Sequence, residues 1–430
     1  MSLEPLDDEG DTMTLQDQMN AIGQAAKAAA SELALATSEQ KNDAIRAAAA
    51  EIRAAAKSIQ AANQQDMAAG QAAGLSSAKL DRLLLTDDRI EAMAQGLEDV
   101  ANLDEPVGRV LSAWDRPNGL KIQRVSTPLG VIGVIYESRP NVTADAGALC
   151  LKAGNATILR GGSDSFHSST AILAALRKGL VTAGLPEAAV QSVPTTDRAA
   201  VGMLLSMTAY VDVVVPRGGK SLVERVQQEA RVPVFSHLDG LNHTFVDAAA
   251  DIDMAVDIVL NAKMRRTGIC GAMETLLVHR DIADAFLPKA ARALEAKACV
   301  LRGDEASRAI VSSMEIATQE DWETEYLDSI LAVKVVTDLD EAVRHIATYG
   351  SSHTEVIITD DHRAAEDFAT RVDAAIVMHN ASSQFADGGE FGMGAEIGIS
   401  TGRMHARGPV GANQLTSYKY VVCGDGQLRP

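Results

Sequence analysis

A continuous apolar run at residues 130–137 constrains the fold of this chain more than any other feature of its sequence. The run reads GVIGVIYE and has the length of a single strand. Such a run suits a strand that is buried on both faces of a sheet. Strand-like and helix-like segments alternate after it, which is typical of a parallel, doubly wound sheet. We therefore predict an α/β fold.

A second parallel sheet is expected, because the alternation restarts beyond residue 250. Residues 415–424 read as an isolated edge strand, and an exposed edge normally needs a partner. Together with the ribbon at 119–129, this segment is expected to pair with another subunit. The strands predicted for the two sheets are 130–137, 156–162, 189–194, 210–219 and 232–237, then 273–280, 331–336, 355–360 and 374–379.

The N-terminal quarter of the chain is expected to be helical. Residues 14–105 are rich in alanine and contain no proline, and we interpret the alanines as positions of close helix packing. Thr37 and Gln40 have the spacing of a capping box, in which each side chain satisfies a free N–H group at a helix start. Residues 1–13 are acidic and are expected to form a disordered tail.

Composition excludes several functional classes. The chain has 430 residues and a formal net charge of −19, with only 3% aromatic residues, which argues against nucleic-acid binding. No apolar run approaches the roughly 20 residues needed to span a bilayer, and the N-terminus does not resemble a signal peptide. Four scattered cysteines do not make a disulfide framework. We therefore expect a cytoplasmic enzyme.

Two predicted strand-to-helix junctions carry pairs of glycines. The residues are Arg160, Gly161, Gly162 and Ser163 at one junction, and Pro216, Arg217, Gly218 and Gly219 at the other. Glycines at such a junction let backbone N–H groups approach an anion at a helix N-terminus, although turn glycines are the simpler explanation for either one alone. Two such junctions in one sheet predict a dinucleotide with an extra phosphate, NADP.

Cys270 is the candidate nucleophile. It follows Arg265 and Arg266 in a loop between a predicted helix and a predicted strand, and cationic neighbours favour the reactive thiolate. A buried structural thiol is the alternative. His237 and His243 lie six residues apart, but no third ligand has suitable spacing, so no metal site is predicted.

Two further segments suggest contact with substrate. Residues 387–396 are too rich in glycine for a regular element and predict a loop that approaches substrate closely. Arg407 follows that loop, and its guanidinium is suited to bind a carboxylate or a phosphate in a bidentate manner. A surface arginine is the alternative.

Taken in order, these motifs resemble one family. The segments GVIGVIYESRPNVT, ILRGGS, VPRGGKS, NAKMRRTGIC and DGGEFGMGAEIGISTGRMHARGPVG are similar to those of the gamma-glutamyl phosphate reductases, in the aldehyde dehydrogenase superfamily. Residues 336–354 resemble that family's signature. The resemblance implies the following domains: the tail (1–13), an NADP-binding domain (14–118 and 130–240), a catalytic domain with Cys270 (241–400) and an oligomerisation ribbon (119–129 and 405–430).

The resemblance also implies roles for individual residues. Cys270 corresponds to the nucleophile, while Arg160 and Ser163 correspond to residues that hold the adenosine ribose and its 2′-phosphate. The Pro216–Gly219 turn would face the pyrophosphate, and Glu325 the nicotinamide ribose. Asn141 is the only asparagine near the position of the oxyanion asparagine, and its role stays open. Arg265, Arg266 and Arg407 are candidates for the substrate's phosphate and α-carboxylate.

One departure from the superfamily bears on the reaction. Hydrolytic members carry a glutamate that activates water, and here His237 stands at that position. The substitution favours acyl-phosphate chemistry, with His237 lining the substrate site. The implied reaction is NADPH-dependent reduction of L-glutamyl 5-phosphate to L-glutamate 5-semialdehyde, in proline biosynthesis. The alternatives are a hydrolytic NAD(P)-dependent dehydrogenase and a catalytically silent binding protein. Expected partners are further copies of the chain and glutamate 5-kinase.

Overall fold

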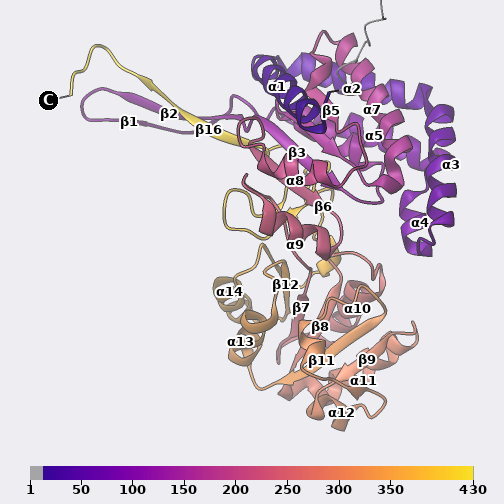
Figure 1. The fold of residues 1–430 in the computed structure, drawn as a ribbon. Helices are drawn as coiled ribbons and strands as arrows, with labels where there is room; N and C mark the ends of the chain where they lie inside the picture. Colours follow the sequence, from indigo (N-terminus) through magenta and orange to yellow (C-terminus); the bar gives the residue numbers. More distant parts are fainter. Residues whose placement is uncertain (1–12, 430) are drawn as a thin grey trace, which may run out of the picture. The chain divides into compact units, whose positions relative to one another are not determined.

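The computed structural model describes residues 13–429 and divides the chain into two compact units (Figure 1). The first unit contains the chain up to residue 218, residues 225–234 and the segment from 415 onward, and the second contains 219–224 and 235–414. The predicted disordered tail lies outside the described residues except for its last position. The functions assigned to the predicted domains stay predictions.

The first unit is built on a four-stranded parallel sheet in the order β5-β4-β3-β6. In chain order this is 3-2-1-4, the beginning of the dinucleotide-binding arrangement. All six residues of β3 are buried, as the apolar run predicts. The strands are β3 (Val131–Tyr136), β4 (Ala156–Arg160), β5 (Val190–Ser192) and β6 (Val213–Arg217).

Helices cover this sheet, and the N-terminal ones pack closely. Thr37 caps α2 in a complete capping box with Gln40, which confirms that prediction. A Cβ atom at Gly179 of α7 would lie only 2.5 Å from the backbone nitrogen of Ala48 in α2, so the two backbones are nearly in contact. The helices are α1 (Leu15–Leu33), α2 (Ser38–Ala54), α3 (Ala56–Ala72), α4 (Ser77–Leu83), α5 (Asp87–Asn102), α6 (Val142–Lys152), α7 (Phe166–Thr182), α8 (Ala199–Ser206) and α9 (Lys220–Glu229).

A separate three-stranded antiparallel ribbon belongs to the first unit (Figure 1). Its strands are β1 (Val110–Asp115), β2 (Lys121–Pro128) and β16 (Thr416–Cys423), in the order β1-β2-β16. The C-terminal strand is therefore not isolated: it pairs with the 119–129 segment of the same chain along its whole length. The ribbon also includes β1, a strand that the sequence analysis did not predict.

The second unit contains a seven-stranded parallel sheet in the order β10-β9-β11-β8-β7-β12-β13. Three of these strands escaped the sequence analysis: β7 because it carries polar residues, and β9 and β10 because they are short. Residues 232–237 are not the predicted strand, since only Val234 forms an isolated bridge, to Val214. The strands are β7 (Asn242–Val246), β8 (Met273–His279), β9 (Val300–Gly303), β10 (Glu315–Ile316), β11 (Ile330–Val336), β12 (Thr354–Ile358) and β13 (Ile376–His379).

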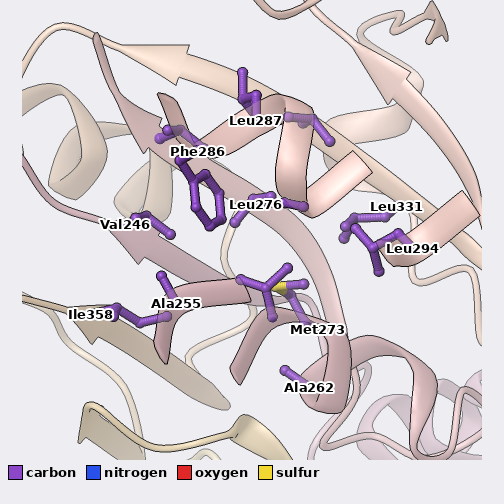
Figure 2. Close-up of a cluster of buried hydrophobic side chains, with 14 of the residues drawn as sticks. Val246, Ala255, Ala262, Met273, Leu276, Phe286, Leu287, Leu294, Leu331 and Ile358 are labelled. Carbon is purple, nitrogen blue, oxygen red and sulfur yellow. The ribbon is translucent and has the colours of Figure 1, made fainter. Parts of the chain in front are cut away.

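Both faces of this second sheet are covered. Alternate side chains of the strands form one core with α10 and α11 and another with α13 and α14. These two pairs of helices lie on opposite faces of the sheet (Figure 1). The first of these two cores includes Phe286, whose ring lies beside Leu276 in Figure 2. The helices are α10 (Ile252–Met264), α11 (Arg280–Glu295), α12 (Glu305–Ile310), α13 (Leu339–Tyr349) and α14 (His362–Arg371). Within the described part of the chain, no helix has the length and hydrophobicity to cross a membrane.

The core around Phe286 gives a first prediction. Phe286 is fully buried, so Phe286→Ala removes a large apolar surface and leaves a cavity. We expect the free energy of unfolding to fall by about 3–5 kcal/mol, measured by urea denaturation. Ile316→Ala, at a side chain that is 65% exposed in the same unit, is the control and should change it by less than about 0.5 kcal/mol. Equal effects of the two variants would contradict this assignment of the core.

Candidate active site

Cys270 lies in the loop that joins α10 to β8 in the second unit, and its environment differs from that of the other cysteines. Cys150 and Cys299 are buried, and burial raises the pKa of these two thiols to about 12 and about 11. Cys423 is exposed on the ribbon. Cys270 is instead half-buried, between these extremes.

The side chain of Asn242 holds this loop in place. Asn242 begins β7, next to β8, and is completely buried. Its amide nitrogen donates hydrogen bonds to the carbonyl oxygens of Cys270, at 2.6 Å, and Ala272, at 2.8 Å. Its amide oxygen accepts the backbone N–H of Thr354 at 3.2 Å, at the start of β12. One side chain therefore ties the cysteine loop to two strands.

Gly240 packs directly against the same loop. A Cβ atom at this position would lie 2.2 Å from the carbonyl oxygen of Cys270, so no other residue fits without displacement. The backbone N–H of Gly240 donates to Glu325 Oε1 at 2.9 Å. Burial raises the pKa of Glu325 above its usual value, although this hydrogen bond opposes the shift. Glu325, the predicted ribose ligand, therefore also supports the segment behind Cys270.

A buried ion pair closes the base of the loop. Lys263, at the end of α10, lies 2.5 Å from Glu274 in β8, and both side chains are almost completely buried. Burial raises the pKa of Glu274 to about 7, while the nearby Lys263 opposes the shift. Glu274 also accepts the backbone N–H of Leu327 at 3.2 Å. This buried ion pair therefore holds together the two residues that flank the segment 264–273.

Two histidine rings lie beside Cys270. One ring nitrogen each of His237 and His353 and the sulfur of Cys270 all lie within 4.8 Å of one another. The two rings meet edge to face, with centroids 5.0 Å apart. His237 is half-buried and lies in an irregular segment, and its Nδ1 is 2.8 Å from the carbonyl oxygen of Ile399. His243 is not part of this group, because it forms a buried pair with Glu355 in the sheet.

The predicted arginines of the substrate site differ in their surroundings. Arg265 and Arg266 are exposed at the start of the cysteine loop. Arg407 instead lies 2.7 Å from Asp373, which also pairs with Arg403, so its guanidinium is already neutralised. Residues 387–396 form neither helix nor strand, as predicted, and Glu396 accepts the backbone N–H of Gly388 at 3.0 Å.

The predicted cofactor residues of the first unit lie at the carboxyl edge of its sheet. Gly161 and Gly162 follow β4, and Gly218 follows β6, the two strands that flank β3. Arg160 is turned away from solvent: it is only 6% exposed and donates to the carbonyl oxygens of Thr196 and Asp197 at 3.0 and 3.3 Å. Burial and the nearby charge of Arg198 lower its pKa.

The other residues of these two junctions are placed as follows. Ser163 is exposed at the start of a short 3₁₀ turn, and Gly218 and Gly219 are exposed before α9. Pro216 is buried in β6, and Arg217 is half-buried. Gly219 falls in the second unit with Lys220, whose Nζ lies 2.8 Å from Asp239. This hydrogen bond raises the pKa of Lys220.

Asn141 lies at the start of α6, after a tight turn. Ser138 has a φ of 49°, and its hydroxyl and backbone N–H both bond to Asp164, which holds the turn. The Asn141 amide donates to Asp145 at 2.9 Å. Burial raises the pKa of Asp145 to about 6. Asn141 is thus oriented by the carboxyl group of the half-buried Asp145, which sequence reasoning did not single out.

Sequence reasoning also missed Asn242, Gly240, Glu274 and His353. Asn242 lies 28 positions before Cys270 and 112 before Thr354, and Glu274 lies 53 before Leu327, so no local pattern reveals these contacts. The signal for His353 was present, since it falls in the 336–354 segment that resembles the family signature.

Known proteins resemble this chain over nearly its whole length. Residues 12–308 match the model of the aldehyde dehydrogenase family. The chain is 64% identical to the gamma-glutamyl phosphate reductase of Rhodospirillum rubrum, covering 95% of this chain and 96% of that protein. It is 61% identical to that of Paramagnetospirillum magneticum, covering 96% and 97%.

Solved structures agree with these relatives. The gamma-glutamyl phosphate reductase of Thermotoga maritima is 44% identical, with a TM-score of 0.94 over 96% of this chain and 100% of that one. An acetylating aldehyde dehydrogenase from Geobacillus thermoglucosidasius is 16% identical, with a TM-score of 0.68 over 97% and 98%, and shares the fold alone.

The fold and the family model define an oxidoreductase of the aldehyde dehydrogenase type. Within that class the chain belongs to the gamma-glutamyl phosphate reductase family. The fold class, the resemblance and the enzymatic function predicted from the sequence are confirmed, and neither alternative function is favoured by these relatives.

The contact at Gly240 gives a second prediction. Gly240→Ala must displace the Cys270 backbone, so we expect turnover to fall about 100-fold, as misplacement of a reacting group by 1 Å can cause. Alkylation of Cys270 by iodoacetamide, followed by mass spectrometry, should change in rate as well. Gly96→Ala, in open space on α5, is the control and should alter neither. Wild-type alkylation and turnover in Gly240→Ala would refute the role of this contact.

Proposed function

We propose that the protein reduces L-glutamyl 5-phosphate to L-glutamate 5-semialdehyde with NADPH, through a thioester on Cys270. The observation that carries this proposal is the arrangement at Cys270: a half-buried cysteine on a braced loop, with the rings of His237 and His353 beside it. The names of the relatives with 57–64% identity agree with this reaction.

The first unit fits a nicotinamide dinucleotide. In open α/β sheets, ligands bind outside the carboxyl ends of the strands, where the strand order reverses. The order β5-β4-β3-β6 has such a reversal beside β3, and the exposed glycines follow the strands at that edge. Glycine there leaves room for a pyrophosphate against the backbone. When bound, the cofactor supplies the hydride that reduces the thioester.

The 2′-phosphate of NADPH would meet Ser163 and Arg198. Ser163 is exposed, whereas the Arg160 guanidinium is occupied by backbone carbonyls. Arg198 is exposed and near enough to Arg160 to influence its pKa. We therefore assign Arg160 to holding the 196–197 loop and Arg198 to the phosphate charge, which modifies the role that the sequence suggested for Arg160.

Cys270 performs the covalent chemistry. Its thiolate attacks the acyl carbon, the bond from that carbon to the phosphate oxygen breaks, and inorganic phosphate leaves with the electron pair. The Cys270 backbone N–H stabilises the developing oxyanion, and the role of Asn141 stays open. Because Asn242 and Gly240 fix the loop before substrate binds, the sulfur needs little reorganisation.

The surroundings of Cys270 favour phosphate over water as the partner of the acyl group. The resemblance implies that His237 stands where hydrolytic members of the superfamily carry the glutamate that activates water, and its Nδ1 lies 2.8 Å from the carbonyl oxygen of Ile399. Hydrolysis of the thioester would waste the product of the preceding step. Arg265 and Arg266 are the proposed ligands for the substrate's negative charges, with Arg407 in a lesser role because Asp373 already neutralises it.

The ribbon is the proposed contact with another copy of the chain. Large apolar side chains on it are exposed, among them Trp114, Tyr420 and Val422. A cluster of this kind on a projecting sheet is typical of an interface rather than of a monomer surface. Association with glutamate 5-kinase and a cytoplasmic location stay predictions.

The nucleophile gives a third prediction. Cys270→Ser retains the size and shape of the side chain but weakens the nucleophile, so we expect turnover to fall by at least about 1000-fold. Activity is measured as NADPH oxidation with enzymatically generated glutamyl phosphate. Cys423→Ser, at the exposed cysteine, is the matched control and should retain wild-type activity. Near-normal turnover in Cys270→Ser would contradict the mechanism.

The cofactor assignment gives a fourth prediction. Ser163→Asp places a negative charge where we expect the 2′-phosphate, so the preference for NADPH over NADH should fall at least about tenfold, by repulsion of like charges. The ratio of kcat/KM for the two cofactors measures it. Ser31→Asp, on an exposed face of α1, is the control. An unchanged ratio in Ser163→Asp would place the 2′-phosphate elsewhere.

A further inference from the structure

We propose that His237, Cys270 and His353 form a binding site for Zn²⁺ or a similar soft divalent metal, which blocks the cysteine when bound. Their three ligand atoms lie within 4.8 Å of one another. The sequence predicted no metal, because His237 and His243 lacked a third ligand. The fold instead joins His237 to a cysteine and to a histidine that lie 33 and 116 positions further along the chain.

The hydrogen bonds of His237 prepare its ring for a metal. Its Nδ1 lies 2.8 Å from the carbonyl oxygen of Ile399. A carbonyl only accepts hydrogen bonds, so in the neutral ring Nδ1 carries the proton and Nε2 carries the lone pair. Zinc sites in proteins use this same arrangement, in which an oxygen acceptor holds the ring nitrogen opposite the metal.

His353 provides a second, independent observation. It is completely buried, and its Nδ1 is 2.8 Å from the Thr354 hydroxyl. Its Nε2 is also buried and has no hydrogen-bond partner among the described residues. An unsatisfied buried polar atom is unfavourable. A metal ion bound by Nε2 would satisfy this nitrogen and so offset the cost of burying it.

The donor set and spacing suit zinc. One thiolate and two imidazoles are preferred ligands of Zn²⁺, with bonds of about 2.0–2.3 Å. Tetrahedral ligands at those bond lengths are about 3.5 Å apart, so the three atoms, which lie within 4.8 Å of one another, need to approach by at most about 1.3 Å. Cys270 and His237 are half-buried, and rotation of their side chains would supply this approach. A fourth position remains for water.

Metal binding would switch off Cys270 reversibly. The ion takes the sulfur lone pairs that would attack the substrate, and it binds the deprotonated thiol, so binding releases a proton. The loss of activity rests on Cys270 being the nucleophile of the proposed function, whereas metal binding itself does not depend on it. The two can therefore be tested separately.

The decisive experiment measures metal binding to the full-length protein. Zn²⁺ affinity is measured by competition with a chromophoric chelator, and Co²⁺ is added as a spectroscopic probe of the ligands. We expect one ion per chain and a cobalt–thiolate charge-transfer band. Cys270→Ala and His353→Gln should each weaken Zn²⁺ binding at least about 100-fold and remove or shift the band. A site that keeps wild-type affinity in either variant overturns the proposal.

Two controls separate this site from unspecific binding. His362→Ala and Cys423→Ser remove an exposed histidine and an exposed cysteine and should leave affinity unchanged. Thr354→Val is nearly isosteric and removes only the hydroxyl that holds His353, so we expect a loss of about 10–100-fold. Circular dichroism verifies that each variant is folded. If His353→Gln does not fold, Cys270→Ala provides the test, because Cys270 is only half-buried.

Activity gives a further arm of the test. Zn²⁺ should inhibit the wild-type enzyme and protect Cys270 from alkylation, and EDTA should reverse both effects. Protection without inhibition would uphold the metal site and contradict the proposed nucleophile. Absence of both binding and the cobalt band would overturn the metal site and leave the proposed reaction intact.

Discussion

The two hydrogen bonds from Asn242 to the cysteine loop are the interaction on which the site in the second unit depends. A loop between a helix and a strand has no ladder of its own to fix it, and here one buried amide bonds to the carbonyls of Cys270 and Ala272. The amide is itself held by the sheet, through Thr354. The position of the sulfur therefore follows from strand pairing and not from the loop's own sequence.

Buried charge supports the same loop at its base. The pair of Lys263 and Glu274 lies between the end of α10 and the start of β8, where both groups are removed from water. Such a pair contributes little net stability, because desolvation offsets attraction, but loss of one partner leaves a buried charge unpaired. The pair instead fixes the position of the end of α10 relative to β8, since both buried groups must stay in contact. In the first unit, the turn at Ser138, where φ is 49°, precedes Asn141, and the half-buried Asp145 orients the Asn141 amide.

The fold could be predicted from the sequence where local pattern decides structure. The apolar run that forms β3 and the capping box at Thr37 both carry local signals, and both formed as expected. Strand β7 could not be found this way, because Asn242, His243 and Thr244 are polar. They are buried because β7 pairs with β8 and β12, which lie further along the chain. Cys270 had a local signal in its arginine neighbours. Asn242 and His353 meet it only through the sheet order, which no local pattern contains.

The central claim of this account is that the acyl group on Cys270 is exchanged with phosphate and not with water. The reverse reaction tests it most directly: reduction of NADP by L-glutamate 5-semialdehyde, measured with and without inorganic phosphate. We predict that the steady-state rate requires phosphate and becomes saturated as phosphate is raised. A rate that is independent of phosphate would contradict the account, because water would then resolve the thioester despite His237.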